Sequence, residues 1–131
     1  MAAQQRPLSP HLQIYSRQIT SVMSIMHRAT GVFLALGAFA LMAWLLACAG
    51  DPDSFAAFQS LAGSMLGKIA LFAFAGALVY HFLNGIRHLL WDVGWGFEIP
   101  RVYASGYVVL ALTVVITAAI AFVALNAGGA A

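Results

Sequence analysis

The sequence predicts an all-α membrane protein with three transmembrane helices, on the basis of its composition and of three long apolar runs. Hydrophobic residues make up 63% of the 131 positions and charged residues only 8%, whereas a soluble domain carries about a quarter charged residues. Six cationic and four anionic side chains cannot solvate the surface of such a chain. An ordinary cytosolic enzyme, a disordered tail and a nucleic-acid-binding protein are therefore excluded. The single cysteine, Cys48, lies in an apolar run, which excludes a disulfide framework and a thiolate metal cluster.

The first helix is predicted over residues 21–50. Its apolar part, Gly31 to Ala49, carries no charge, and a helix needs about 20 mostly apolar residues to cross the hydrocarbon core. We expect the helix to begin before this part, because Thr20 and Ser21 are good N-cap residues and no helix breaker follows them.

The second and third helices are predicted over residues 64–93 and 103–127, which are apolar apart from polar residues near the end of the second. None of the runs alternates polar and apolar residues with period two, which argues against strands. Residues 50–54 are interpreted as a helix stop and turn, and two glycines and a proline interrupt residues 94–101. Residues 1–131 are therefore predicted to form a single membrane-anchor domain.

Cationic residues near the helix ends predict the orientation in the membrane. Lys68 lies alone on one side, and five arginines lie on the other: Arg6, Arg17, Arg28, Arg87 and Arg101. We therefore expect residues 1–20 and the second connection to be cytoplasmic. The N-terminus is neither apolar nor arginine-rich enough for a signal or transit peptide, so we expect it to be retained. A bacterial cytoplasmic membrane is favoured over the mitochondrial inner membrane.

A stripe of polar residues on the second helix predicts a ligand site. His81, Gly85, His88 and Asp92 share one helix face, and His81 lies roughly 16 Å inside the helix end, about halfway across the core. Ionisable groups at this depth normally face protein, a cofactor or water. Because imidazole is a nitrogen ligand and glycine leaves room for a flat macrocycle, the stripe favours haem over a histidine that only bonds a neighbouring helix. His88 and Asp92 are interpreted as an ion pair or as support for the site, and Arg87 as snorkelling to the surface.

Both axial ligands of one haem iron are not expected from this chain. His81 and His88 lie on the same helix face about two turns apart, so they cannot approach one iron from opposite sides. Three helices also provide too little protein surface to enclose a porphyrin. We therefore expect the second ligand from a partner chain, with the three helices forming half of a haem-binding helical bundle.

A second polar cluster begins the first helix. Ser24 and Arg28 are neighbours at i and i+4, and His27 points about 100° away. A hydroxyl and a guanidinium together suit a carbonyl or an anionic oxygen. The alternative is that Arg28 snorkels and Ser24 bonds its own backbone. Arg28 and His27 are also placed to neutralise haem propionates.

Three stretches of the sequence are distinctive: residues 6–15 (RPLSPHLQIY), 24–31 (SIMHRATG) and 81–92 (HFLNGIRHLLWD). Together they resemble the cytochrome b556 membrane-anchor subunits of succinate dehydrogenase, respiratory complex II. The third predicted helix matches only in hydropathy. The resemblance implies a subunit that pairs with a second membrane anchor and docks an iron–sulfur subunit and a flavoprotein subunit. Electrons from succinate would then reach ubiquinone, with haem b held between the two anchors.

The resemblance also implies roles for individual residues. His81, the first residue of the pattern HxxxGxRH, would be the axial ligand of the haem iron. Ser24 and Arg28 of the pattern SxxHR would line the quinone site beside Ile25. The implied haem-binding set is His27, Arg28, Gly31, His81, Gly85 and His88. His11 would meet the soluble subunits.

Two alternatives stay open on the sequence. One is the cytochrome b anchor of a fumarate reductase that works with menaquinone. The other is a small transporter or channel subunit with His81 and Arg28 as an ion relay. No dinucleotide fingerprint or cysteine cluster occurs in the sequence, so succinate oxidation itself is assigned to other subunits.

Overall fold

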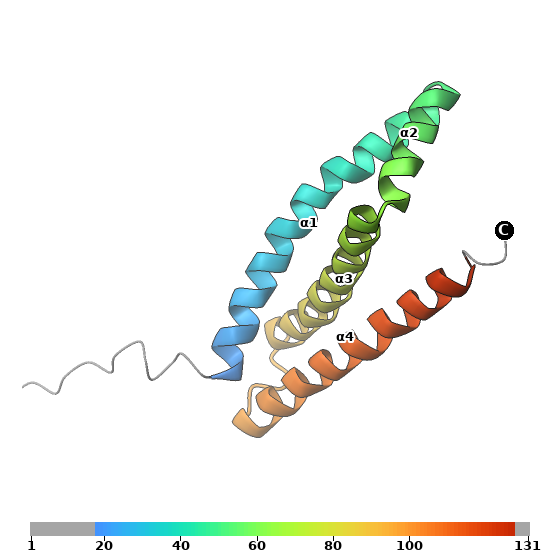
Figure 1. Cartoon of the computed structure of the whole chain (residues 1–131). Helices are drawn as coiled ribbons and strands as arrows, with labels where there is room; N and C mark the ends of the chain where they lie inside the picture. The colour runs from blue at the N-terminus through green and yellow to red at the C-terminus, as the bar shows by residue number, and fades with distance from the viewer. Residues whose placement is uncertain (1–17, 128–131) are drawn as a thin grey trace, which may run out of the picture.

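The computed structural model of the protein describes residues 18–127; His11 and the stretch 6–15 lie outside the described residues. The described helices are α1 (Ile19–Ala49), α2 (Pro52–Gly63), α3 (Met65–Asp92) and α4 (Ile99–Ala127) (Figure 1). Three of them, α1, α3 and α4, are long and apolar enough to cross a membrane. The predicted all-α class with three transmembrane helices is therefore confirmed, and residues 18–127 contain no strand.

The short helix α2 was not predicted, and its ends show why it forms. The Asp51 side chain accepts a hydrogen bond from the Ser54 N–H at 2.8 Å, and Pro52 opens the helix. These are helix-start signals, so the stretch interpreted only as a stop and turn also begins a new helix. At the other end, the Ser64 hydroxyl accepts from the Gly67 N–H at 3.1 Å and caps α3.

The last helix begins earlier than expected. It starts at Ile99 instead of residue 103, and Pro100 occupies its first turn, where the missing N–H would have no helical partner. Two glycines make the connection that precedes it: Gly94 and Gly96 have φ values of 83° and 84°, a region that L side chains rarely adopt.

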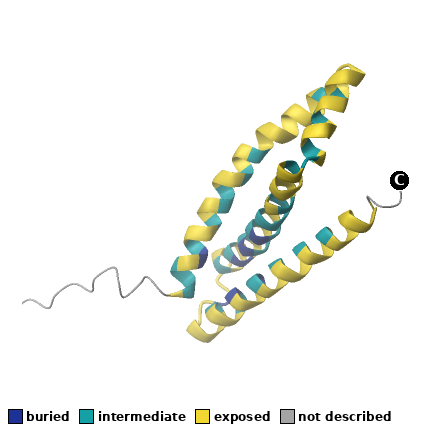
Figure 2. Ribbon diagram, viewed as in Figure 1, coloured by how far each residue is buried: buried dark blue, intermediate teal, exposed yellow. Residues whose placement is uncertain are grey.

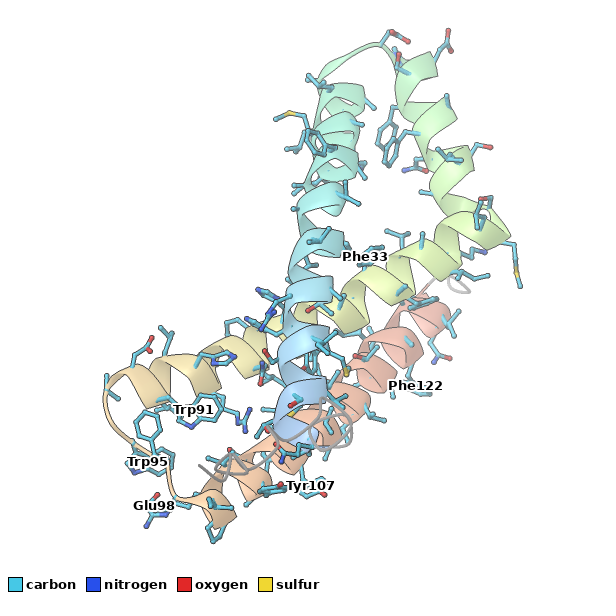
Figure 3. The ribbon with its side chains drawn as sticks, turned by 90° about the vertical axis from the view of Figure 1, so that its left-hand side faces the viewer. Phe33, Trp91, Trp95, Glu98, Tyr107 and Phe122 are labelled. Carbon is cyan, nitrogen blue, oxygen red and sulfur yellow. The ribbon has the colours of Figure 1, made fainter. Side chains whose placement is uncertain are left out.

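The three long helices meet at one end of the molecule. The N-terminal half of α1 crosses the C-terminal half of α3 and the start of α4, and α4 diverges from the others toward its C-terminus (Figures 1 and 3). Trp91, Trp95 and Tyr107 lie at this end (Figure 3). The buried residues of the long helices gather at the same crossing (Figure 2), and they are Met23, Tyr80, Asn84, Arg87, Gly106 and Val109. Elsewhere large apolar side chains are exposed, as expected of helices that contact lipid or other chains.

Candidate functional site

The crossing of α1 and α3 brings together the polar clusters of the two helices. The His27 and His81 rings stack with centroids 4.0 Å apart and an interplanar angle of 7°. His88 lies on the other side of the cluster, with its ring centroid 5.0 Å from that of His27. The three histidines, His27, His81 and His88, are called the histidine cluster below. The sequence places each residue on its helix, but only the structure shows that His27 contacts both others.

Hydrogen bonds at Nδ1 orient the imidazole ring of His81. Its Nδ1 lies 3.1 Å from the His27 carbonyl oxygen and 3.2 Å from Thr30 Oγ1. Because a carbonyl only accepts, this contact favours the tautomer with the proton on Nδ1 and the lone pair on Nε2. Among the described residues, Nε2 makes no hydrogen bond. A histidine whose Nδ1–H is held by a carbonyl while Nε2 stays available has the arrangement of a metal ligand.

Thr30 is a site residue that the sequence reasoning missed. Its hydroxyl bonds the backbone carbonyl of Met26 at 2.8 Å, one turn earlier in α1, which leaves the oxygen lone pairs available to the His81 Nδ1–H. A threonine within an apolar helix commonly bonds its own backbone in this way. That pattern is readable from sequence, but its contact with α3 is not.

Two glycines flank His81 in different ways. A Cβ at Gly31 would lie 3.1 Å from His81 Cε1, so the absence of a side chain lets α1 approach the imidazole closely. A Cβ at Gly85, one turn after His81, would meet nothing within 4 Å. The chain itself therefore does not require glycine at position 85, whereas a flat ligand beside His81 would.

The other two histidines do not complete a metal site with His81. The His27 and His81 rings lie face to face and nearly parallel, so they cannot approach one metal ion from opposite sides. His88 Nε2 lies 3.3 Å from the Asn84 amide nitrogen. In the described part of the chain, the ion pair expected between His88 and Asp92 is not formed. Residues 18–127 also hold no group of three His, Cys, Asp or Glu side chains suited to a metal ion. The donor set of the described residues fits a single metal ligand, His81.

Ser24 and Arg28 form a separate site on another face of α1. Arg28 Nη2 donates to Ser24 Oγ at 3.0 Å, as their spacing predicts. They line a shallow hollow of about 400 Å³ together with Thr20, Ser21 and Ile25. Among the described residues, neither side chain makes a hydrogen bond to a histidine of the histidine cluster.

Arg87 corrects one expectation. It does not snorkel to the surface, because its side chain is buried, with 4% exposed. Its Nη2 donates to the Val102 carbonyl at 2.7 Å and its Nε donates to Ser105 Oγ at 2.9 Å, so the guanidinium faces α4. Hydrogen-bond acceptors of α4 stabilise the guanidinium inside the protein, so the Arg87 side chain does not have to extend to water.

Comparisons with known proteins find a matching family model and several similar sequences. The family model described as "Succinate dehydrogenase/Fumarate reductase transmembrane subunit" matches residues 2–120. The succinate dehydrogenase cytochrome b556 subunit of Rickettsia prowazekii is 43% identical over 112 residues, which cover 86% of this chain and 87% of the relative. The corresponding subunit of Paracoccus denitrificans is 41% identical over 111 residues, with 85% of each chain covered. The mitochondrial succinate dehydrogenase cytochrome b560 subunit of Homo sapiens is 47% identical over 116 residues, which cover 83% of this chain and 66% of the relative.

Proposed function

The chain belongs to the succinate dehydrogenase/fumarate reductase transmembrane subunit family, and we propose that it is the haem b-binding anchor of a succinate dehydrogenase and helps to form its ubiquinone-reduction site. Its relatives are named as cytochrome b subunits of succinate dehydrogenase. Family membership favours this role over the ion-relay alternative. In this role the chain is a non-autonomous subunit of an oxidoreductase, and succinate oxidation takes place on other subunits.

The orientation of His81 is the observation that carries the haem proposal. Its Nδ1 is held by the His27 carbonyl and by Thr30 Oγ1, at 3.1 and 3.2 Å, so Nε2 is left as the ligand atom. Gly85 leaves open space one turn away. These features fit haem b with His81 as one axial ligand and a residue of a second anchor subunit as the other.

Further residues of the chain would support the bound haem. Gly31 lets α1 lie against His81. Arg28 would supply positive charge for the propionates, and His27 and His88 would supply hydrogen-bond donors. Haem b supplies reversible one-electron chemistry when it is bound. The chain's own contribution is to hold the imidazole and fix its tautomer.

The pair Ser24 and Arg28 would bind one quinone carbonyl oxygen. Because Ser24 Oγ accepts from Arg28 at 3.0 Å, the serine hydroxyl proton remains available to donate to a substrate oxygen. The guanidinium has further N–H donors and a fixed charge, which stabilise negative charge as the quinone is reduced. Ile25, with 65% of its surface exposed, provides an apolar wall beside the pair.

The assembly would consist of this chain, a second membrane anchor, an iron–sulfur subunit and a flavoprotein subunit. The exposed apolar faces of α1, α3 and α4 support contacts with a second anchor and with lipid. Arg28, Arg87 and Arg101 lie at the end where the helices meet, whereas Lys68 lies at the other end. This distribution supports an N-terminus in the cytoplasm, and the bacterial relatives support a place in a bacterial cytoplasmic membrane.

The haem assignment is tested by the optical spectrum of the complete complex. We expect His81→Leu to remove the reduced α-band or to convert low-spin to high-spin haem, because one axial ligand is lost. His88→Leu is the matched variant, and we expect its low-spin spectrum to persist because His88 bonds Asn84 and is not a ligand. An unchanged spectrum in His81→Leu would contradict the assignment.

The quinone assignment is tested by two activities of the same membranes. Ser24→Ala or Arg28→Leu should depress succinate–ubiquinone reduction and leave the reduction of an artificial dye by the soluble subunits intact. The matched control is Arg101→Leu, since Arg101 lies at the same end of the molecule but pairs with Glu98 on the surface at 3.3 Å. Equal loss of both activities would refute the role of the pair, and titration with ubiquinone and menaquinone analogues identifies the quinone class.

A further inference from the structure

A buried arginine occupies the centre of the three-helix crossing. Arg87 is 4% exposed, although an uncompensated charge within a membrane span is costly. Its guanidinium donates to Val102 O at 2.7 Å, to Ser105 Oγ at 2.9 Å and to Asn84 Oδ1 at 3.4 Å. The charge is also 4.2 Å from the centre of the Trp91 ring, within cation–π range. Each of the three guanidinium nitrogens therefore donates at least one hydrogen bond.

The contacts of Arg87 reach all three long helices. Val102 and Ser105 belong to the first turns of α4, and Arg87 Nη1 lies 4.0 Å from the Met23 sulfur of α1. Gly106 makes this approach possible, because a Cβ there would lie 3.0 Å from Met23 Sδ and 3.6 Å from Arg87 Nη2. Arg87 thus contacts both neighbours of α3 at the same level of the crossing.

The same junction is linked to both candidate sites. Met23 precedes Ser24, and its carbonyl accepts the Tyr80 hydroxyl at 2.8 Å, next to His81. On the other side, Arg87 bonds the oxygen of the Asn84 amide, so the amide nitrogen is presented to His88 Nε2 at 3.3 Å. One guanidinium therefore helps to set the position of α1 and the hydrogen bonding of the histidine cluster.

We propose that Arg87 is the positioning residue that holds the quinone-binding pair on α1 and the haem-ligating histidine on α3 in register through its contacts with Met23, Asn84 and α4. The proposal rests on the proposed function of those two sites. Arg87 acts through geometry, since it makes no hydrogen bond to Ser24 or His81 among the described residues.

The test compares Arg87→Lys with Arg101→Lys in the complete complex. Lysine keeps the charge but replaces the planar fork with one ammonium group, which cannot serve α4 and Asn84 together or stack on Trp91 in the same way. We expect Arg87→Lys to lower kcat/KM for ubiquinone by about tenfold to a hundredfold, because a misplacement of about 1 Å in a positioned group can cost about a hundredfold in rate. We also expect a shifted haem spectrum or midpoint potential, with unchanged dye reduction. Arg101→Lys, on the surface, should change none of these.

A second variant covers the case in which Arg87→Lys does not assemble. Ser105→Ala removes one acceptor of Arg87 and keeps the arginine, so we expect a smaller change in the same direction in both readouts. Unchanged ubiquinone kinetics and haem spectrum in whichever variant assembles would overturn the proposal. Ser24→Ala and His81→Leu, measured in parallel, separate the two failures. If they alter the ubiquinone kinetics and the haem spectrum, respectively, only the role of Arg87 is lost; if they do not, the proposed function itself fails.

Discussion

Substitution of Gly85 separates what the chain requires from what a bound haem requires. The structure has no atom within 4 Å of a Cβ built at this position, and Gly85 lies in the interior of α3. Alanine is more favourable than glycine in a helix interior by about 1 kcal/mol. Judged from this chain alone, Gly85→Ala should raise the free energy of unfolding by up to about that amount. If a flat macrocycle lies beside His81, the same change must weaken haem binding.

The assay measures haem content and thermal midpoint on the same purified complex. Gly76→Ala is the matched control on α3, because its Cβ would lie 3.5 Å from Thr117 Cγ2, an ordinary van der Waals distance. We expect Gly76→Ala to keep its haem, Gly85→Ala to lose part of it and Gly85→Leu to lose most of it. A Gly85→Leu complex with full haem content and an unchanged spectrum would refute the reasoning, because the open space would then not belong to the haem site.

Two further predictions concern the fold. Tyr80→Phe removes a buried hydroxyl that donates to Met23 O at 2.8 Å. It should lower the free energy of unfolding, measured by denaturant titration, by about 1 kcal/mol or less. Tyr103 is exposed, so the control Tyr103→Phe should change this free energy little. The Ser54 N–H and hydroxyl hold the pKa of Asp51 below its ordinary value, so the cap stabilises α2 fully above the unfolded-state pKa and is lost as pH falls through the lower folded-state pKa. Amide exchange in the first turn of α2, corrected for intrinsic rates, should show this loss. Asp51→Asn should abolish the pH dependence. The same pH profile of amide exchange in wild type and Asp51→Asn would contradict the assignment.

The spans were predictable because each one depends on its own residues. A transmembrane helix satisfies its backbone hydrogen bonds internally, so about 20 apolar residues without charge are sufficient to predict it. The boundaries were less predictable, because the same residues carry stop and start signals. Asp51 and Pro52 begin α2 directly after α1 ends, and Pro100 lies inside α4 and does not precede it.

In the candidate sites, too, features within one helix were predictable and contacts between helices were not. That Ser24 and Arg28 are neighbours follows from helix spacing alone and was readable from the sequence, and the structure adds the hydrogen bond between them. The stacking of His27 on His81, the contact of Thr30 and the burial of Arg87 were not readable. These features depend on which face of each helix turns toward its neighbour. Helices that are apolar on nearly every side do not encode that choice in their own hydropathy.

The sequence by itself therefore determined the membrane class and the three spans, because these follow from local composition, and its helix periodicity placed Ser24 beside Arg28 and His81 in line with Gly85 and His88. The tertiary structure decided which histidines meet, which glycine the chain itself needs, and that Arg87 faces α4 and not water. The physical reason is that these features arise from contacts across the helix crossing, where polar partners far apart in the sequence satisfy one another.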